Sequence, residues 1–381
     1  MPAPVQFEGQ RLEGAQVTAN LFAQSKTVLE GGGLHRGRIP KRQNPFALKY
    51  PRSVCSLPPA SIPSLLCSRL FVAPSQAEIS MSLRRARELL DRAEARRLVL
   101  PERGVEVALL DWGGAGPLAL LHHANGFCKG LWALVAEGLC DRYRVIAMDA
   151  RGHGDSSRPE GPAAYGWDYF SLDLAAVAER LLAECGVDRV SLGIGHSFGG
   201  TAFLGASVRR PELFDRILLV DPVTPARTEG VPPERTEHHR SLVDRARRRR
   251  AEWPSRAAAF DWWRERELFS EWLPEALGLY ALDGLGERVD GSVELKCPGE
   301  VEAAVFAGSL GFDVASLVRG APTKALFLWA KRGNFPLPLY QELAASMRDA
   351  RVEEVDASHL IPMEQPDLVV EAAQRFAAEE G

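Results

Sequence analysis

Short apolar runs alternate with amphipathic stretches along the chain from about residue 105 onward. Several of the runs are continuously apolar, which is typical of strands covered on both faces, as in a parallel sheet. The runs predict strands at Val105–Trp112, Leu118–His122, Arg144–Met148, Arg189–Gly193, Arg216–Val220, Ala325–Trp329 and Val352–Val355.

Helical periodicity fills the segments between these runs. The predicted helices are Gly130–Leu139, Trp167–Cys185, Gly199–Val208, Leu339–Met347 and Pro366–Ala378. Alternation of strands and helices indicates βαβ units with right-handed crossovers. The pattern therefore predicts an α/β fold with a mostly parallel central sheet flanked by helices.

Two segments interrupt the alternation and divide the chain. Residues 1–80 are rich in proline and basic residues, and we expect them to form a disordered N-terminal extension. A wrongly included upstream stretch, with Met81 as the true initiator, a disordered tail and an organelle transit segment all fit this composition. Residues 226–321 are helical, charged and tryptophan-bearing, with no clear strand, and indicate a helical insertion. The core is expected in residues 81–225 and 322–381.

Composition then narrows the class of protein. Lys+Arg 46 against Asp+Glu 50 gives a net charge of −4, so we expect no nucleic-acid partner. No apolar stretch approaches the ~18 residues of a transmembrane helix, and no export signal is recognisable. Six cysteines without a CxxC pair indicate reduced thiols rather than a disulfide or zinc framework. These features predict a cytoplasmic protein without a membrane span.

The strongest chemical signal is the hexapeptide GHSFGG at residues 195–200, between a predicted strand and a predicted helix. In a GxSxG segment of this kind, the glycines permit a sharp turn that lifts the serine hydroxyl above the sheet. The N-terminus of the following helix favours developing negative charge. We therefore expect Ser197 to be a nucleophile.

A serine nucleophile needs a general base and a group that orients the base. His359 lies on a loop after a predicted strand and is the expected base. No carboxylate follows the strand Ala325–Trp329, but Asp221 ends the strand Arg216–Val220 and is the expected acid. Asn334 as a weak orienting amide, or an acid from elsewhere, stays open as the alternative.

Three further predictions concern the surroundings of the serine. The segment LLHHANGF at residues 120–127 leaves a strand at a glycine, so the backbone N–H groups of Phe127 and Phe198 are expected to hold an oxyanion. Asn125 is a candidate for substrate contact. Trp262 and Trp263 are candidates too, although cap core is their simpler interpretation.

These motifs together resemble the α/β-hydrolase superfamily over roughly Val105–Ala378, with the insertion where that superfamily carries a helical cap. HANGFCKGLW, the GHSFGG turn and LKCPGEVEA at residues 295–303 also resemble a subgroup of acyl-ester and acyl-CoA hydrolases. The resemblance implies an α/β-hydrolase fold and a serine hydrolase. Its expected substrate is a small-molecule carboxylic ester or thioester, cleaved through an acyl-enzyme without a cofactor. Related epoxide hydrolases and haloalkane dehalogenases use a carboxylate where this chain has Ser197.

Alternatives stay open at this point. The same residues fit hydrolysis of a C–C or peptide bond. The missing carboxylate after Ala325–Trp329 also fits a catalytically weak ligand-binding protein on a hydrolase fold. The basic run Arg245–Arg250 is expected to be a solvated helix face, with phosphate binding as the alternative. Glu237-His238-His239 has no further ligands nearby, so no metal site is expected.

Overall fold

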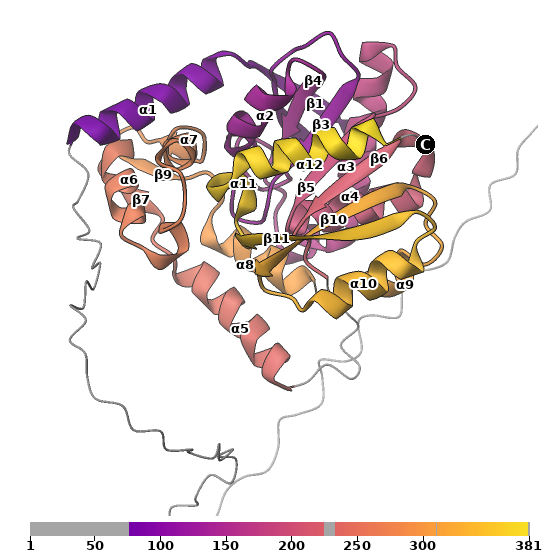
Figure 1. Cartoon of the computed structure of the whole chain (residues 1–381). Helices are drawn as coiled ribbons and strands as arrows, with labels where there is room; N and C mark the ends of the chain where they lie inside the picture. The colour runs from indigo at the N-terminus through magenta and orange to yellow at the C-terminus, as the bar shows by residue number, and fades with distance from the viewer. Residues whose placement is uncertain (1–75, 225–232, 310, 380–381) are drawn as a thin grey trace, which may run out of the picture. The chain divides into compact units, whose positions relative to one another are not determined.

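The computed structural model describes residues 76–224, 233–309 and 311–379. Within these ranges, eight strands form one sheet in the order β1-β2-β4-β3-β5-β6-β10-β11 (Figure 1). The pairs β1–β2 and β2–β4 are antiparallel, and the other neighbouring pairs are parallel. The strands are β1 (Glu94–Leu100), β2 (Val105–Asp111), β3 (Leu118–His122), β4 (Arg144–Met148), β5 (Leu192–His196), β6 (Arg216–Val220), β10 (Lys324–Arg332) and β11 (Ala350–Ser358).

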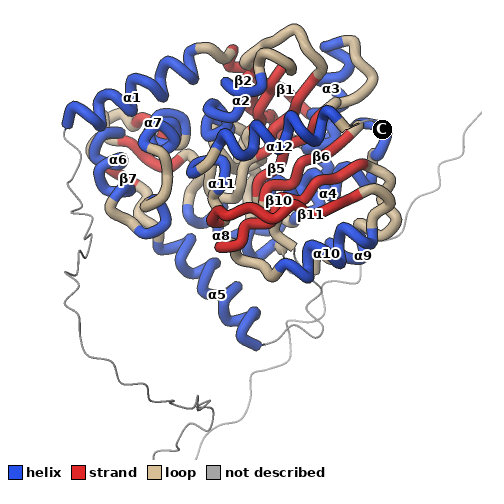
Figure 2. Tube along the Cα trace, viewed as in Figure 1, coloured by secondary structure: helices blue, strands red, loops and turns tan. Residues whose placement is uncertain are grey.

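Helices cover both faces of this sheet. One face packs against α2 (Ala133–Leu139) and α12 (Pro366–Ala378), and Figure 2 shows α12 crossing over the strands. The other face packs against α3 (Trp167–Cys185), α4 (Phe198–Arg209) and α10 (Leu337–Ser346). Side chains of β6 alternate between the two apolar clusters, which explains why its sequence is continuously apolar. The predicted mostly parallel sheet between helices is confirmed.

Several strand limits depart from the prediction: β10 ends at Arg332 rather than Trp329, and β11 spans Ala350–Ser358 rather than Val352–Val355. β1 was not anticipated, because its first four residues, EARR, are mostly exposed and only Leu98 and Leu100 are buried. It is an antiparallel edge strand, so one side of its ladder has no strand neighbour. β5 begins at Leu192 rather than Arg189 and reaches His196, directly before the serine.

The insertion contains both helices and strands. Its helices are α5 (Pro233–Arg248), α6 (Arg256–Arg264), α7 (Pro274–Asp283) and α8 (Gly299–Gly308), followed by the short α9 (Val314–Leu317). The expectation of no strand is wrong: β7 (Glu252–Trp253), β8 (Leu285–Glu287) and β9 (Val293–Leu295) form an antiparallel sheet in the order β7-β9-β8. These strands are too short for alternation to reveal them.

The first described helix, α1 (Gln76–Asp91), changes the expected boundary at Met81. It begins before Met81, and Ile79 is only 2% exposed within the apolar cluster of the cap. The helix packs against α7, where a Cβ on Gly278 would lie 3.0 Å from the Cβ of Ala86. Residues 76–80 therefore belong to the folded unit, while the expectation for residues 1–75 lies outside the described residues.

Candidate active site

The turn around Ser197 joins β5 to α4 and has the geometry that the glycine pattern predicts. Ser197 has φ 54° and ψ −119°, a strained conformation for a residue with a side chain. A Cβ on Gly195 would lie 2.5 Å from the carbonyl oxygen of Gly199, and a Cβ on Gly199 would lie 2.3 Å from that of His122. Only glycine fits at these two positions, so the sequence GxSxG is what allows the tight turn.

Three side chains from separate parts of the chain meet at this turn. The Ser197 hydroxyl lies 2.8 Å from Nε2 of His359, which follows β11 directly. Nδ1 of His359 lies 2.6 Å from Oδ2 of Asp221, which follows β6. Because parallel strands end at one edge of the sheet, residues far apart in sequence converge there. The three residues expected to act together are brought together.

The Asp221 carboxylate is fully buried and held on its second oxygen. Oδ1 accepts a hydrogen bond from the Ala330 N–H at 3.1 Å and lies 3.2 Å from the Tyr340 hydroxyl, which also lies 2.8 Å from the Pro222 carbonyl. A Cβ on Gly333 would lie 2.6 Å from Oδ2. The Asp221 carboxylate thus occupies the space beside the end of β10, a strand that is not followed by a carboxylate of its own.

Asn334 stands apart from this arrangement. Its side chain is exposed and makes no hydrogen bond to any described residue. Asp221 rather than Asn334 therefore faces the ring of His359.

Four buried histidines surround the turn. Burial lowers the pKa of His122 to about 4, that of His153 to about 4 and that of His196 to about 3. Burial also holds the pKa of His123 well below its ordinary value. These rings are neutral and act as hydrogen-bonding parts of the loops; for example, His196 Nε2–H donates to the His359 carbonyl at 2.8 Å.

Of the two expected backbone donors near the serine, only Phe127 is already engaged. Phe198 opens α4, so its N–H has no partner one helical turn earlier and stays available. The Phe127 N–H instead donates to the Ala124 carbonyl at 3.2 Å within its own loop. The Ala124 N–H makes no hydrogen bond to a described residue, and the carbonyls of His122 and His123 just before it adjoin Gly199 of the turn. Among the described residues, the Ala124 N–H is thus unengaged beside the turn, whereas that of Phe127 is not.

The cap contacts the loop that carries Asn125. The Asn125 amide donates to the Glu302 carbonyl at 3.0 Å, so it is engaged with the cap. The Tyr280 hydroxyl donates to the Gly126 carbonyl at 2.9 Å, and Arg249 donates to the Tyr280 oxygen and to Glu302. Arg249, from the basic run, is thus a half-buried cation that joins the cap helices to this loop.

The two tryptophans proposed for substrate contact occupy other places. Trp263 is buried and stacks on Tyr280 with ring centroids 4.6 Å apart. Trp262 is half-buried under the guanidinium of Arg266, 4.3 Å from its ring centroid. Both belong to the aromatic packing of the cap, and neither lines the cavity beside the serine.

A buried cation was missed by sequence reasoning. Lys129 Nζ lies 2.7 Å from Asp149, 2.8 Å from Asp155 and 3.2 Å from Asp283 of α7. Burial alone would lower the pKa of Lys129, but the carboxylates outweigh it and raise that pKa. Burial raises the pKa of Asp149 to about 6 even though Lys129 opposes this shift. The cluster links the core to the cap.

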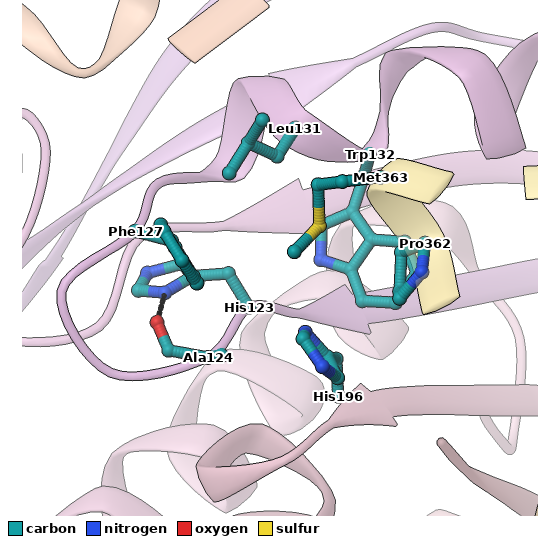
Figure 3. A pocket seen from close by; sticks show the side chains of 8 residues that line it. All are labelled: His123, Ala124, Phe127, Leu131, Trp132, His196, Pro362 and Met363. Atoms are coloured by element: carbon teal, nitrogen blue, oxygen red, sulfur yellow. Dashed lines mark hydrogen bonds between the residues drawn. The ribbon is translucent and has the colours of Figure 1, made fainter. Parts of the chain in front are cut away.

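A cavity of about 10 Å³ lies beside the turn (Figure 3). It is lined by His123, Ala124, Phe127, Leu131, Trp132, His196, Pro362 and Met363. In the described ranges, no group of three or more histidine, cysteine or acidic side chains could hold a metal ion. None of the helices described has the length and apolar character needed to cross a bilayer.

Comparison with known proteins identifies the family. The model of the alpha/beta hydrolase family matches residues 119–372, a range that contains Ser197, Asp221 and His359. The chain therefore belongs to the alpha/beta hydrolase family.

Solved structures agree on the fold. E-2-(acetamidomethylene)succinate hydrolase superposes with a TM-score of 0.64 at 21% identity, covering 75% of this chain and 100% of that one. The thioesterase domain from the curacin biosynthetic pathway gives a TM-score of 0.60 at 19% identity, over 74% and 99%. Identity this low shows a shared fold and no more.

Curated relatives match shorter segments. An uncharacterized protein of Mycobacterium tuberculosis is 36% identical over 107 residues, 28% of this chain and 29% of that protein. The 2-hydroxy-6-oxo-2,4-heptadienoate hydrolase of Pseudomonas putida is 35% identical over 133 residues, 34% of this chain and 46% of that enzyme. The soluble epoxide hydrolase of a Corynebacterium species is 24% identical over 280 residues, 70% and 91%. The first two matches span less than half of each relative.

Proposed function

We propose that this protein is a serine hydrolase that cleaves a carboxylic ester or thioester of a small acyl substrate through an acyl-enzyme. The observation that carries the proposal is the hydrogen-bonded series of Ser197, His359 and Asp221, with distances of 2.8 and 2.6 Å. A serine beside a histidine that is itself oriented by a carboxylate is the arrangement that activates a hydroxyl for acyl transfer.

In the proposed reaction, the Ser197 oxygen attacks the carbonyl carbon and His359 Nε2 takes the hydroxyl proton. The buried Asp221 carboxylate accepts the His359 Nδ1–H, which fixes the useful tautomer and stabilises the imidazolium. The imidazolium then gives its proton to the leaving alkoxide or thiolate. Water attacks the acyl-enzyme by the same route, and the acid is released with Ser197 restored.

Negative charge develops on the former carbonyl oxygen at each attack. The N–H of Phe198, with the adjacent N-terminus of α4, is the first donor for this oxygen. The N–H of Ala124 replaces that of Phe127 as the second donor, since the latter is already used within its loop. No step calls for a cofactor.

Hydrolysis of a C–C bond is the second candidate. It uses the same residues, and the matched segment of the Pseudomonas putida enzyme, a 2-hydroxy-6-oxo-2,4-heptadienoate hydrolase, favours it. Peptide cleavage has no such relative among those described above. The binding-protein alternative loses its main support, because Asp221 supplies the acid whose absence suggested it.

Labelling with a fluorophosphonate probe tests the proposal. Wild-type protein is expected to be phosphonylated on Ser197, located by peptide mass spectrometry, and to hydrolyse p-nitrophenyl esters or acyl-CoAs. Ser197→Ala is expected to lose labelling and up to roughly 10⁶-fold in kcat, with an unchanged melting temperature. Activity of Ser197→Ala within about tenfold of wild type would exclude this nucleophile.

A further inference from the structure

The cavity beside the Ser197 turn adjoins both halves of the proposed site. His196 in its wall directly precedes Ser197, and its ring centroid lies 5.3 Å from that of His359. Ala124 in the wall belongs to the loop that supplies the second oxyanion donor. A substrate acyl group bound between Ser197 and the Ala124 loop would therefore lie next to this cavity, whose wall is drawn in Figure 3.

The size of the cavity limits what can enter it. A volume of about 10 Å³ corresponds to one water-sized group, so a single hydroxyl or methyl fits. Leu131, Pro362 and Met363 form apolar walls, and the first and last of these side chains are almost fully buried. A long acyl chain has no room here.

One polar group of the wall has no partner. Trp132 is 1% exposed, and its Nε1–H makes no hydrogen bond to any described residue. Figure 3 shows the indole nitrogen on the ring side that faces His123 and Phe127. His123 cannot accept from it, because its Nδ1–H donates to Ala124 O at 2.7 Å and its Nε2 accepts from the Ala150 N–H at 3.0 Å. A buried donor without an acceptor costs roughly 1–3 kcal/mol, so an acceptor atom placed here is stabilised.

We infer that Trp132 determines acyl specificity: its indole N–H donates to an oxygen on carbon 2 of a short acyl group. The preferred substrates are then esters or thioesters of the glycolyl type, with a hydroxyl where a propionyl group has a methyl. The two groups have nearly the same size, so a hydrogen bond rather than fit separates them. This inference rests on the proposed acyl transfer at Ser197.

Phenyl glycolate and phenyl propionate provide the first test, on wild-type protein. The kcat/KM of each ester is divided by the rate constant of its own hydroxide-catalysed hydrolysis, which removes the difference in intrinsic reactivity. The corrected ratio is expected to favour glycolate by about fivefold to tenfold, the worth of one neutral hydrogen bond. A corrected ratio of one or less overturns the inference.

Trp132→Phe provides the second test, because it removes the N–H and keeps an aromatic ring. The glycolate preference is expected to fall to near one. Trp253→Phe is the matched control: its indole nitrogen is also buried and unpartnered among the described residues, but it lies in the cap and not at this cavity, so the preference should persist. A preference that survives in Trp132→Phe overturns the inference.

The outcomes separate the two proposals. If Trp132→Phe does not fold, the wild-type ratio alone decides the specificity. Ester hydrolysis and Ser197 labelling without a glycolate preference refute only the role of Trp132. Absence of both labelling and hydrolysis refutes the proposed function and, with it, this inference.

Discussion

Asp221 occupies a position whose every contact favours a carboxylate. One oxygen faces His359 Nδ1 and the other faces the Ala330 N–H and the Tyr340 hydroxyl. An amide in the same place has one oxygen only. If that oxygen stays with the Ala330 N–H, the NH₂ group of the amide faces Nδ1 of His359 and forces the ring proton onto Nε2. A protonated Nε2 cannot accept the proton of Ser197.

Asp221→Asn is therefore expected to lower kcat by roughly 10⁴, the loss known for a triad aspartate changed to asparagine. Kinetics on a p-nitrophenyl ester, together with melting curves, would measure it. Asn334→Ala is the control and should cost little, since Asn334 is exposed and away from His359. Near-full activity of Asp221→Asn would remove Asp221 from the mechanism.

Among the elements, α1 is expected to contribute to stability through its contact with α7. Ile79→Ala removes buried apolar surface at this contact and should lower the free energy of unfolding by about 2–4 kcal/mol in urea titrations. Met81→Ala, at a side chain that is 60% exposed, should change it by less than about 0.5 kcal/mol. A chain that begins at Met81 lacks Ile79, so we expect it to melt below one that begins at Gln76. Equal losses in the two alanine variants would mean that α1 is not docked.

The Lys129 cluster couples α7 to the loops after β4. Lys129→Met leaves the buried Asp149 carboxylate without its cation, and a loss of about 3–5 kcal/mol in the free energy of unfolding is expected. Lys296→Met is a matched control, because Lys296 pairs with the more exposed Asp155 at 2.7 Å and should contribute under about 1 kcal/mol. Similar losses of unfolding free energy for both lysines, measured by urea unfolding, would contradict the prediction that the buried Lys129 contributes more than Lys296.

For the whole molecule, the buried histidines predict sensitivity to acid. Their pKa values, about 4 for His122 and His153 and about 3 for His196, lie below 6.5, so the unfolded chain binds protons first as the pH falls. The contribution of these rings to the free energy of unfolding is then fully present above about pH 6.5. It is lost as the pH falls toward 4, by roughly 3 kcal/mol for each ring. Asp149, with its pKa raised to about 6, works in the opposite direction but is a single group.

Urea midpoints measured from pH 8 to pH 5 should therefore fall steeply below pH 6.5. His122→Asn removes one titrating ring. The number of protons taken up on unfolding should therefore fall by about one, and the midpoint should depend less steeply on pH. A midpoint that stays constant down to pH 5 would show that these rings are already protonated or solvated in the folded protein.

The sequence predicted those features that depend on local order. The GHSFGG turn needs only a strand, two glycines and a helix, and His359 and Asp221 each directly follow a parallel strand of the sheet. The cap strands are too short to show a period, so they could not be predicted. The engagement of the Phe127 N–H within its own loop and the burial of Lys129 depend on contacts between distant segments, and no pattern along the chain encodes them.

The length of the cap does not affect the spacing between the proposed nucleophile and the proposed acid. Ser197 and Asp221 are both encoded before the cap, and only His359 is encoded after it. Lengthening, shortening or replacement of the cap in a gene leaves the spacing between nucleophile and acid untouched. A substitution at the exposed Asn334, after β10, is likewise expected to leave the pairing of His359 with Asp221 unchanged.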